Sequence, residues 1–171
     1  LFFKPDRTAL VQLAPDPLAV NCLKPYPSWQ NFKPLILNNL EIYRDIANPK
    51  ALRRISLRYI NVFEFDSPEV ELTDYFYYHP NVPPNLPQEF QAFLSRVEIP
   101  YADGTEQLTL TLGTIIPKKP RSTSLTLDID YAIITPEFIS FENVPEWLEK
   151  AHQEVETAFE ASITDKARAL F

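Results

Sequence analysis

The sequence predicts an α+β fold, in which a mostly antiparallel sheet carries helices on one face. Short segments of alternating apolar and polar residues follow one another along the 171-residue chain with few helices between them, which favours antiparallel pairing. Two longer segments repeat apolar residues at helical spacing instead. Hydrophobic residues make up 45% of the chain, enough to fill a core. We therefore expect one α+β domain over residues 1–171.

The first part of the chain is expected to fold as three strands and one helix. A proline fits the first turn of a helix but not the interior, so Pro34 places the helix start near Lys33, after a separate turn at residues 28–31. Asn48-Pro49 is expected to end this helix. The strands are expected at residues 1–3, 8–14 and 18–24, the last two joined by a tight turn at 15–17.

Residues 51–65 form the strand with the clearest alternation. One face is expected to carry Ile55, Leu57, Tyr59, Asn61, Phe63 and Phe65, and the other Arg54, Ser56, Arg58 and Glu64. We expect the segment Leu57–Asn61 to lie inside the sheet, backed by the two helices.

A short helix is expected to follow from Ser67 or Pro68. Asp103-Gly104 predicts a hairpin turn, because both residues tolerate a positive φ. Strands are expected at 92–99, 107–116 and 122–134, a long helix at 145–162 and a short terminal helix at 164–171.

The order of these elements indicates a duplicated β-α-β-β-β-α unit whose first copy is truncated, with halves at 1–48 and 51–163. The helix that closes each half begins with a tryptophan after a proline-containing entry, at Trp29 and Trp147. Tryptophan also favours such positions for packing reasons alone, so both interpretations stay open.

Composition excludes several function classes. A net charge of −7 argues against a non-specific nucleic-acid binder, which needs surplus Lys and Arg. Two glycines are too few for a phosphate-binding loop, and the single Cys22 excludes a cysteine-cluster zinc site. No apolar run is long enough to span a membrane. We expect a cytoplasmic protein with no cofactor, no metal and no membrane contact.

The polar face of the sheet is the first candidate site. Arg54 and Arg58 project from one strand, and Asp128 and Asp130 from another, with the same two-residue period. One interpretation is a ligand groove, in which the guanidinium groups bind an anion and the carboxylates assist. The other, which we favour, is a ladder of cross-strand ion pairs that neutralise one another.

Two single residues interrupt apolar patterns. His152 lies beside the apolar stripe of the last long helix, where a core histidine bonded to a carbonyl or carboxylate is expected. Asn61 interrupts an apolar strand face, so its amide is expected to fix a neighbouring loop or helix end, with ligand contact second.

The aromatic run at residues 75–79 is the candidate partner surface. Consecutive aromatic residues cannot all face one core, so some are expected at the surface, where tyrosines suit protein contacts. The candidate residues are Tyr75, Tyr77, Tyr78 and His79.

The segment Leu57-Arg58-Tyr59-Ile60-Asn61 resembles the signature strand of a sporadically distributed prokaryotic family that has no established activity. Ala151-His152 with Phe159 also fits that family. The resemblance implies that the family's amino-terminal stretch, which would supply the opening strand and helix of the first copy, is missing here. It carries no catalytic residue over to this chain.

The function expected from the sequence is an accessory binding module that associates with a protein partner or with itself, without catalysis. The alternative is an enzyme or a small-anion sensor that uses Arg54, Arg58, Asp128 and Asp130 on the polar sheet face.

Overall fold

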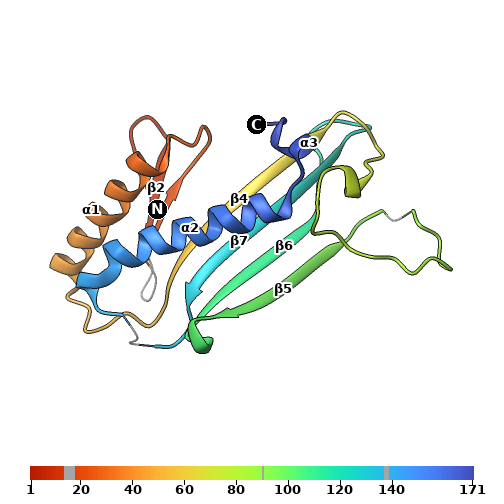
Figure 1. Ribbon diagram of the computed structural model, residues 1–171. Helices are drawn as coiled ribbons and strands as arrows, with labels where there is room; N and C mark the ends of the chain where they lie inside the picture. Colours follow the sequence, from red (N-terminus) through yellow and green to blue (C-terminus); the bar gives the residue numbers. More distant parts are fainter. Residues whose placement is uncertain (14–17, 90, 137–138) are drawn as a thin grey trace. The chain divides into compact units, whose positions relative to one another are not determined.

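The computed structural model describes residues 1–13, 18–89, 91–136 and 139–171, and it confirms the α+β class (Figure 1). The described residues form two antiparallel sheets, one of three strands and one of four, together with three α-helices. The chain divides into two compact units, Leu1–Ala51 and Leu52–Phe171. This boundary lies one residue after the start of the second predicted half at 51, and the duplication itself stays a prediction.

The first unit contains β1 (Phe2–Phe3), β2 (Ala9–Leu13) and β3 (Leu18–Cys22), paired in that order, followed by α1 (Trp29–Ala47). The predicted separate turn at 28–31 is wrong, because α1 is one continuous helix that begins at Trp29 and contains Pro34. Trp29 and Phe32 are buried in edge-to-face contact, which holds the first turn in place although Pro34 provides no N–H. The helix ends at Asn48, as predicted, and the structure shows this residue in the left-handed region. The predicted turn at 15–17 lies outside the described residues.

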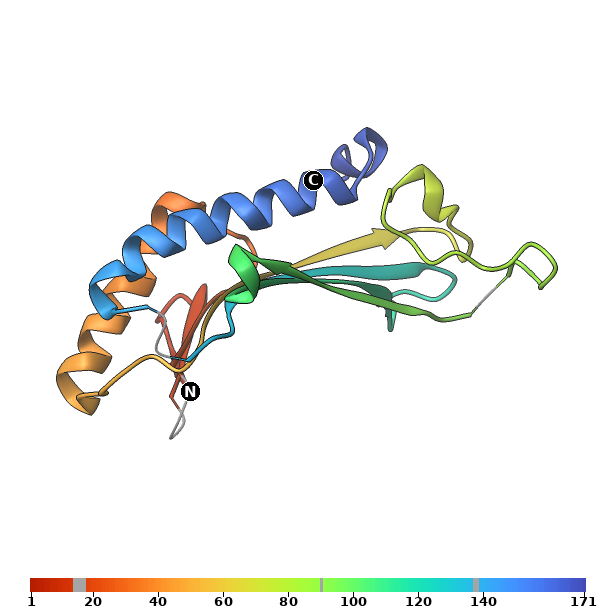
Figure 2. The same ribbon diagram turned by 60° about the horizontal axis from the view of Figure 1, so that its bottom comes forward.

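The second unit is built on four strands: β4 (Ile55–Phe65), β5 (Leu94–Tyr101), β6 (Glu106–Ile115) and β7 (Thr123–Ile133). They pair in the order β4-β7-β6-β5, and every pair is antiparallel. The helix α2 (Val144–Ser162) crosses one face of this sheet and packs on β7 and β4 (Figure 2). The short helix α3 (Asp165–Arg168) follows it.

The two faces of this sheet differ as the alternation in β4 predicts. Leu57 and Phe63 point towards α2 and are buried, whereas Ser56, Arg58 and Glu64 point to the other face and are exposed. The core between the sheet and α2 is mainly apolar, and its largest fully buried members include Phe63, Phe76, Leu112, Leu125, Leu127, Ile129, Ile133 and Leu148.

Three details of the second unit differ from the prediction or refine it. Leu57–Asn61 lies in an antiparallel sheet, but β4 is an edge strand and α1 belongs to the other unit. The helix expected after Ser67 is only the 3-10 turn η1 (Leu72–Asp74), because the chain straightens so that Phe76 bridges Ile163. The predicted hairpin is present, and Asp103 and Gly104 both have a positive φ.

Candidate functional site

The structure brings the four polar-face candidates together as two ion pairs. Arg58 donates from Nε to Asp128 Oδ1 at 2.8 Å and also bonds Asp128 Oδ2, while Arg54 Nη2 lies 2.8 Å from Asp130 Oδ2. The bond to Asp128 raises the pKa of Arg58. Both arginine side chains are 55% exposed. Each charge therefore meets an opposite charge, the arrangement that the ion-pair interpretation describes.

The aromatic run has one buried member, Phe76, and one exposed member, Tyr77, and its other three residues are half-buried. Tyr75 packs edge-on against Phe65 with ring centroids 4.7 Å apart, and Lys166 Nζ lies 4.5 Å above its ring. The Tyr78 hydroxyl lies 2.8 Å from Ser95 Oγ. His79 is half-buried, with Nδ1 3.1 Å from the carbonyl oxygen of its neighbour Pro80.

Tyr77 is the member of this run that faces solvent. It is 70% exposed, and its own N–H donates to Ser162 O at 2.9 Å. Among the four predicted partner residues, Tyr77 thus presents a large exposed ring, and a hydrogen bond fixes its backbone.

A buried carboxylate that was not predicted lies between the sheet and α2. Glu106, at the start of β6, is 3% exposed, and its two oxygens accept three side-chain hydrogen bonds. Trp147 Nε1 donates to Oε1 at 3.0 Å, and the Tyr131 hydroxyl and Lys150 Nζ both donate to Oε2. The donors come from β7 and α2, so the hydrogen bonds of this cluster connect the helix to the sheet.

The electrostatics of this cluster follow from its geometry. Burial by itself would raise the pKa of Glu106, but the bonds from Lys150, Tyr131 and Trp147 outweigh it, so the pKa lies below its usual value. Burial and the bond to Glu106 raise the pKa of Tyr131 well above its usual range. Glu106 is therefore a carboxylate and Tyr131 a neutral donor near neutral pH. A signal was present in the sequence, because Glu106 has the same two-residue phase as the buried Leu108, Leu110 and Leu112.

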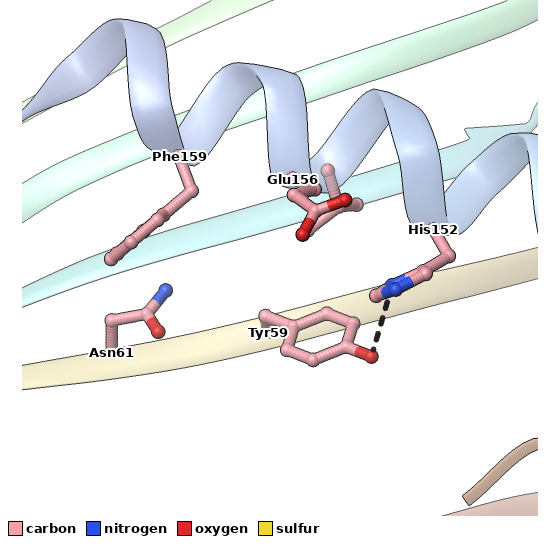
Figure 3. A pocket seen from close by; sticks show the side chains of 6 residues that line it. Tyr59, Asn61, His152, Glu156 and Phe159 are labelled. Carbon is pink, nitrogen blue, oxygen red and sulfur yellow. Dashed lines mark hydrogen bonds between the residues drawn. The ribbon is translucent and has the colours of Figure 1, made fainter. Parts of the chain in front are cut away.

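A cavity of about 150 Å³ lies between β4 and α2 (Figure 3). It is lined by Tyr59 and Asn61 from the strand and by His152, Val155, Glu156 and Phe159 from the helix. Figure 3 shows the strand and helix side chains reaching towards the same space from opposite sides. Sequence reasoning missed this cavity because its two walls are about ninety residues apart in the chain, as the 93-residue separation of Tyr59 and His152 shows.

Both residues that interrupt apolar patterns line this cavity. His152 is half-buried, and its Nδ1 lies 3.4 Å from the Tyr59 hydroxyl. The Asn61 Nδ2 donates to Leu127 O at 3.3 Å. Asn61 therefore bonds the backbone of the neighbouring strand, and not a loop or a helix end as predicted.

Comparison with models of known families, with curated proteins and with solved structures finds no match for this chain. The family resemblance of the β4 segment therefore stays a prediction. In the part of the chain that the structure describes, no three His, Cys, Asp or Glu residues group closely enough to hold a metal ion. None of the helices there is long and apolar enough to cross a membrane.

Proposed function

We propose that this chain is a non-catalytic binding module that associates with protein through the outer edge of β4, and that its partner is a second copy of the chain. The observation that carries the proposal is the length of that edge. Over the described residues, β4 spans eleven residues and is hydrogen-bonded to one strand, β7. Such an edge is a template for a further strand.

The alternation of hydrogen bonds along the strands indicates which backbone groups of β4 point away from β7. The bond from Ile134 N to Thr105 O, 3.0 Å long, extends the β6–β7 ladder by one pair. Bonded pairs alternate in an antiparallel ladder, so the even-numbered residues of β7 face β6 and the odd-numbered ones face β4. In β4 the odd-numbered residues consequently bond β7. The N–H and C=O groups that point outward belong to Ser56, Arg58, Ile60, Val62 and Glu64.

The outward residues are self-complementary. When a second β4 runs antiparallel and is centred on Asn61, Arg58 lies opposite Glu64 of the partner subunit, and Ile60 lies opposite Val62 of the partner subunit. Two-fold symmetry repeats each pair. An opposite-charge cross-strand pair contributes about 0.2–1 kcal/mol, and the pair of Ile60 with Val62 removes apolar surface from water.

The test reverses the charge of Arg58 or of Glu64. Light scattering after size exclusion then measures the oligomeric state over a wide concentration range. We expect a concentration-dependent dimer for the wild type, and a roughly tenfold weaker dimer for Arg58→Glu or for Glu64→Arg, since each places like charges opposite each other. The double variant restores the pair and should recover most of the affinity. Arg96→Glu, on the other edge strand β5, is the matched control and should dimerise like the wild type.

A chain that stays monomeric at every concentration would exclude self-association. A wild-type dimer that both single variants leave unchanged would exclude the β4 edge. Melting curves of each variant separate a lost interface from a lost fold, because Arg58 also pairs with Asp128.

The exposed ring of Tyr77 favours a second candidate function, which is association with a different protein. Its ring is 70% exposed while the adjacent Phe76 is buried and Tyr78 is bonded to Ser95, so binding would immobilise little that is not already ordered. This candidate predicts that Tyr77→Ser abolishes binding to that partner, while Tyr78→Phe, which keeps the ring, does not.

A further inference from the structure

We propose that the cavity between β4 and α2 binds a primary alkylammonium group, with Glu156 as its counter-ion and Asn61 as a second acceptor. This inference is independent of the β4 edge, since the cavity lies on the α2 face of the sheet and Arg58 and Glu64 lie on the opposite face.

The charge of the cavity selects a cation. Glu156 is the one acidic residue among the six that line the cavity, and no lysine or arginine is among them. No ion pair joins Glu156 to another described residue, and every charged residue of α2 except Lys150 is a glutamate. Lys150 is bonded to Glu106. The carboxylate of Glu156 would repel an anion here, and a bound cation would give this carboxylate an opposite charge.

The polar groups favour a cation with N–H donors. Asn61 already donates from Nδ2 to Leu127 O, so its Oδ1 is the amide atom left to accept. The Glu156 carboxylate and the Asn61 amide oxygen are both acceptors, and an ammonium group offers three N–H donors to them.

The remaining walls suit an alkyl chain. Tyr59, Phe159 and Val155 supply aromatic and aliphatic surface, and an aromatic ring face also attracts a cation. A cavity near 150 Å³ holds a molecule about as bulky as benzene, which admits a short alkyl chain with its ammonium head.

The probe is n-butylammonium, followed by NMR shifts of the Asn61 side-chain amide and of the rings of Tyr59 and His152. We expect saturable shifts with a dissociation constant of roughly millimolar size, the scale for so few atoms. Glu156→Gln should weaken binding by at least about fivefold, because it removes a charge-assisted hydrogen bond. Glu146→Gln removes the same charge from the first turn of the same helix and should leave binding unchanged.

Three results would overturn the proposal. The first is the absence of saturable shifts at these residues. The second is equal weakening by Glu156→Gln and Glu146→Gln, which would reduce the effect to the net charge of the protein. The third is binding of 1-butanol or tetramethylammonium at least as tight as that of n-butylammonium, because neither presents an ammonium N–H.

Two further ligands distinguish a small amine from a lysine side chain as the source of the ammonium group. Cadaverine presents it on a free amine, and Nα-acetyl-lysine amide presents it on a peptide unit. Tighter binding of the first assigns the site to small amines, and tighter binding of the second assigns it to a lysine side chain of a protein. Both outcomes keep the chemistry proposed here.

Discussion

Two carboxylate–cation pairs lie on opposite faces of the four-stranded sheet, and they differ in how much water reaches them. In the pair on the α2 face, the Glu106 side chain is 4% exposed and Lys150 is 46% exposed. In the pair on the other face, Asp128 is 18% exposed and Arg58 is 55% exposed. Glu106 also accepts hydrogen bonds from two donors that are themselves buried, Tyr131 and Trp147, whereas Asp128 accepts its hydrogen bonds from the half-exposed Arg58.

The difference shows that burial, more than the presence of an opposite charge, decides what a charged group contributes. When an exposed partner is lost, water replaces it at little cost. When a buried acceptor is lost, its donors stay dry and unpaired, and the full desolvation cost remains. The Glu106 cluster is therefore expected to matter for the stability of the second unit, and the polar-face pairs are expected to matter little.

The largest effect is expected from Glu106→Ala. This change leaves the hydroxyl of Tyr131 and the indole N–H of Trp147 buried without an acceptor, so the free energy of unfolding should fall by about 3 kcal/mol. Chemical denaturation at neutral pH measures it. Glu98→Ala, which removes a half-exposed glutamate from β5, is the matched control and should cost less than about 0.5 kcal/mol. A loss below about 1 kcal/mol for Glu106→Ala would contradict the comparison.

The next largest effect is expected in how the contribution of Glu106 to the free energy of unfolding changes with pH. The pKa of Glu106 is lower in the folded state than the value of about 4.3 expected in the unfolded chain, so its contribution is complete above that value. It is lost as the pH falls through the folded pKa. The stability difference between the wild type and Glu106→Gln should thus be constant near neutral pH and shrink in acid. Denaturation curves from neutral to acid pH test this, and a difference that does not change with pH would refute it.

A smaller effect is expected at Asn61, whose amide bonds a backbone carbonyl beside a cavity and not in a dry core. Asn61→Leu removes the bond from Nδ2 to Leu127 O, and we expect a loss of about 1 kcal/mol. Thermal melting measures it, with Asn85→Leu in an exposed loop as the control. An unchanged melting temperature would mean that the bond to Leu127 contributes nothing.

What could be predicted from the sequence was local. The alternation from Ile55 to Phe65 predicted both faces of β4, and Asp103-Gly104 predicted the hairpin, because such patterns depend on neighbours in the chain. The same two-residue period predicted that Arg58 and Asp128 share one face of the sheet, but not that their strands are neighbours.

What could not be predicted depends on which strands are neighbours and on where α2 crosses them. Tyr59 and His152 meet only because α2 lies over β4, and no local pattern carries that information. Glu106 is an intermediate case. Its phase showed a charge on the apolar face of its strand, but its three donors lie on β7 and α2, so its role could not be deduced from β6 alone.

The smallest effect is expected from Asp128→Asn, which tests the exposed half of the comparison. The substitution keeps the shape of the side chain and removes its charge, and the 55% exposed guanidinium of Arg58 stays in contact with water. The free energy of unfolding should fall by less than about 1 kcal/mol, and by less still at high salt, because ions screen an exposed pair. Denaturation at low and high salt measures both quantities. A loss as large as that of Glu106→Ala, and independent of salt, would mean that Asp128 behaves as a buried charge and that the two faces of the sheet do not differ in the way proposed.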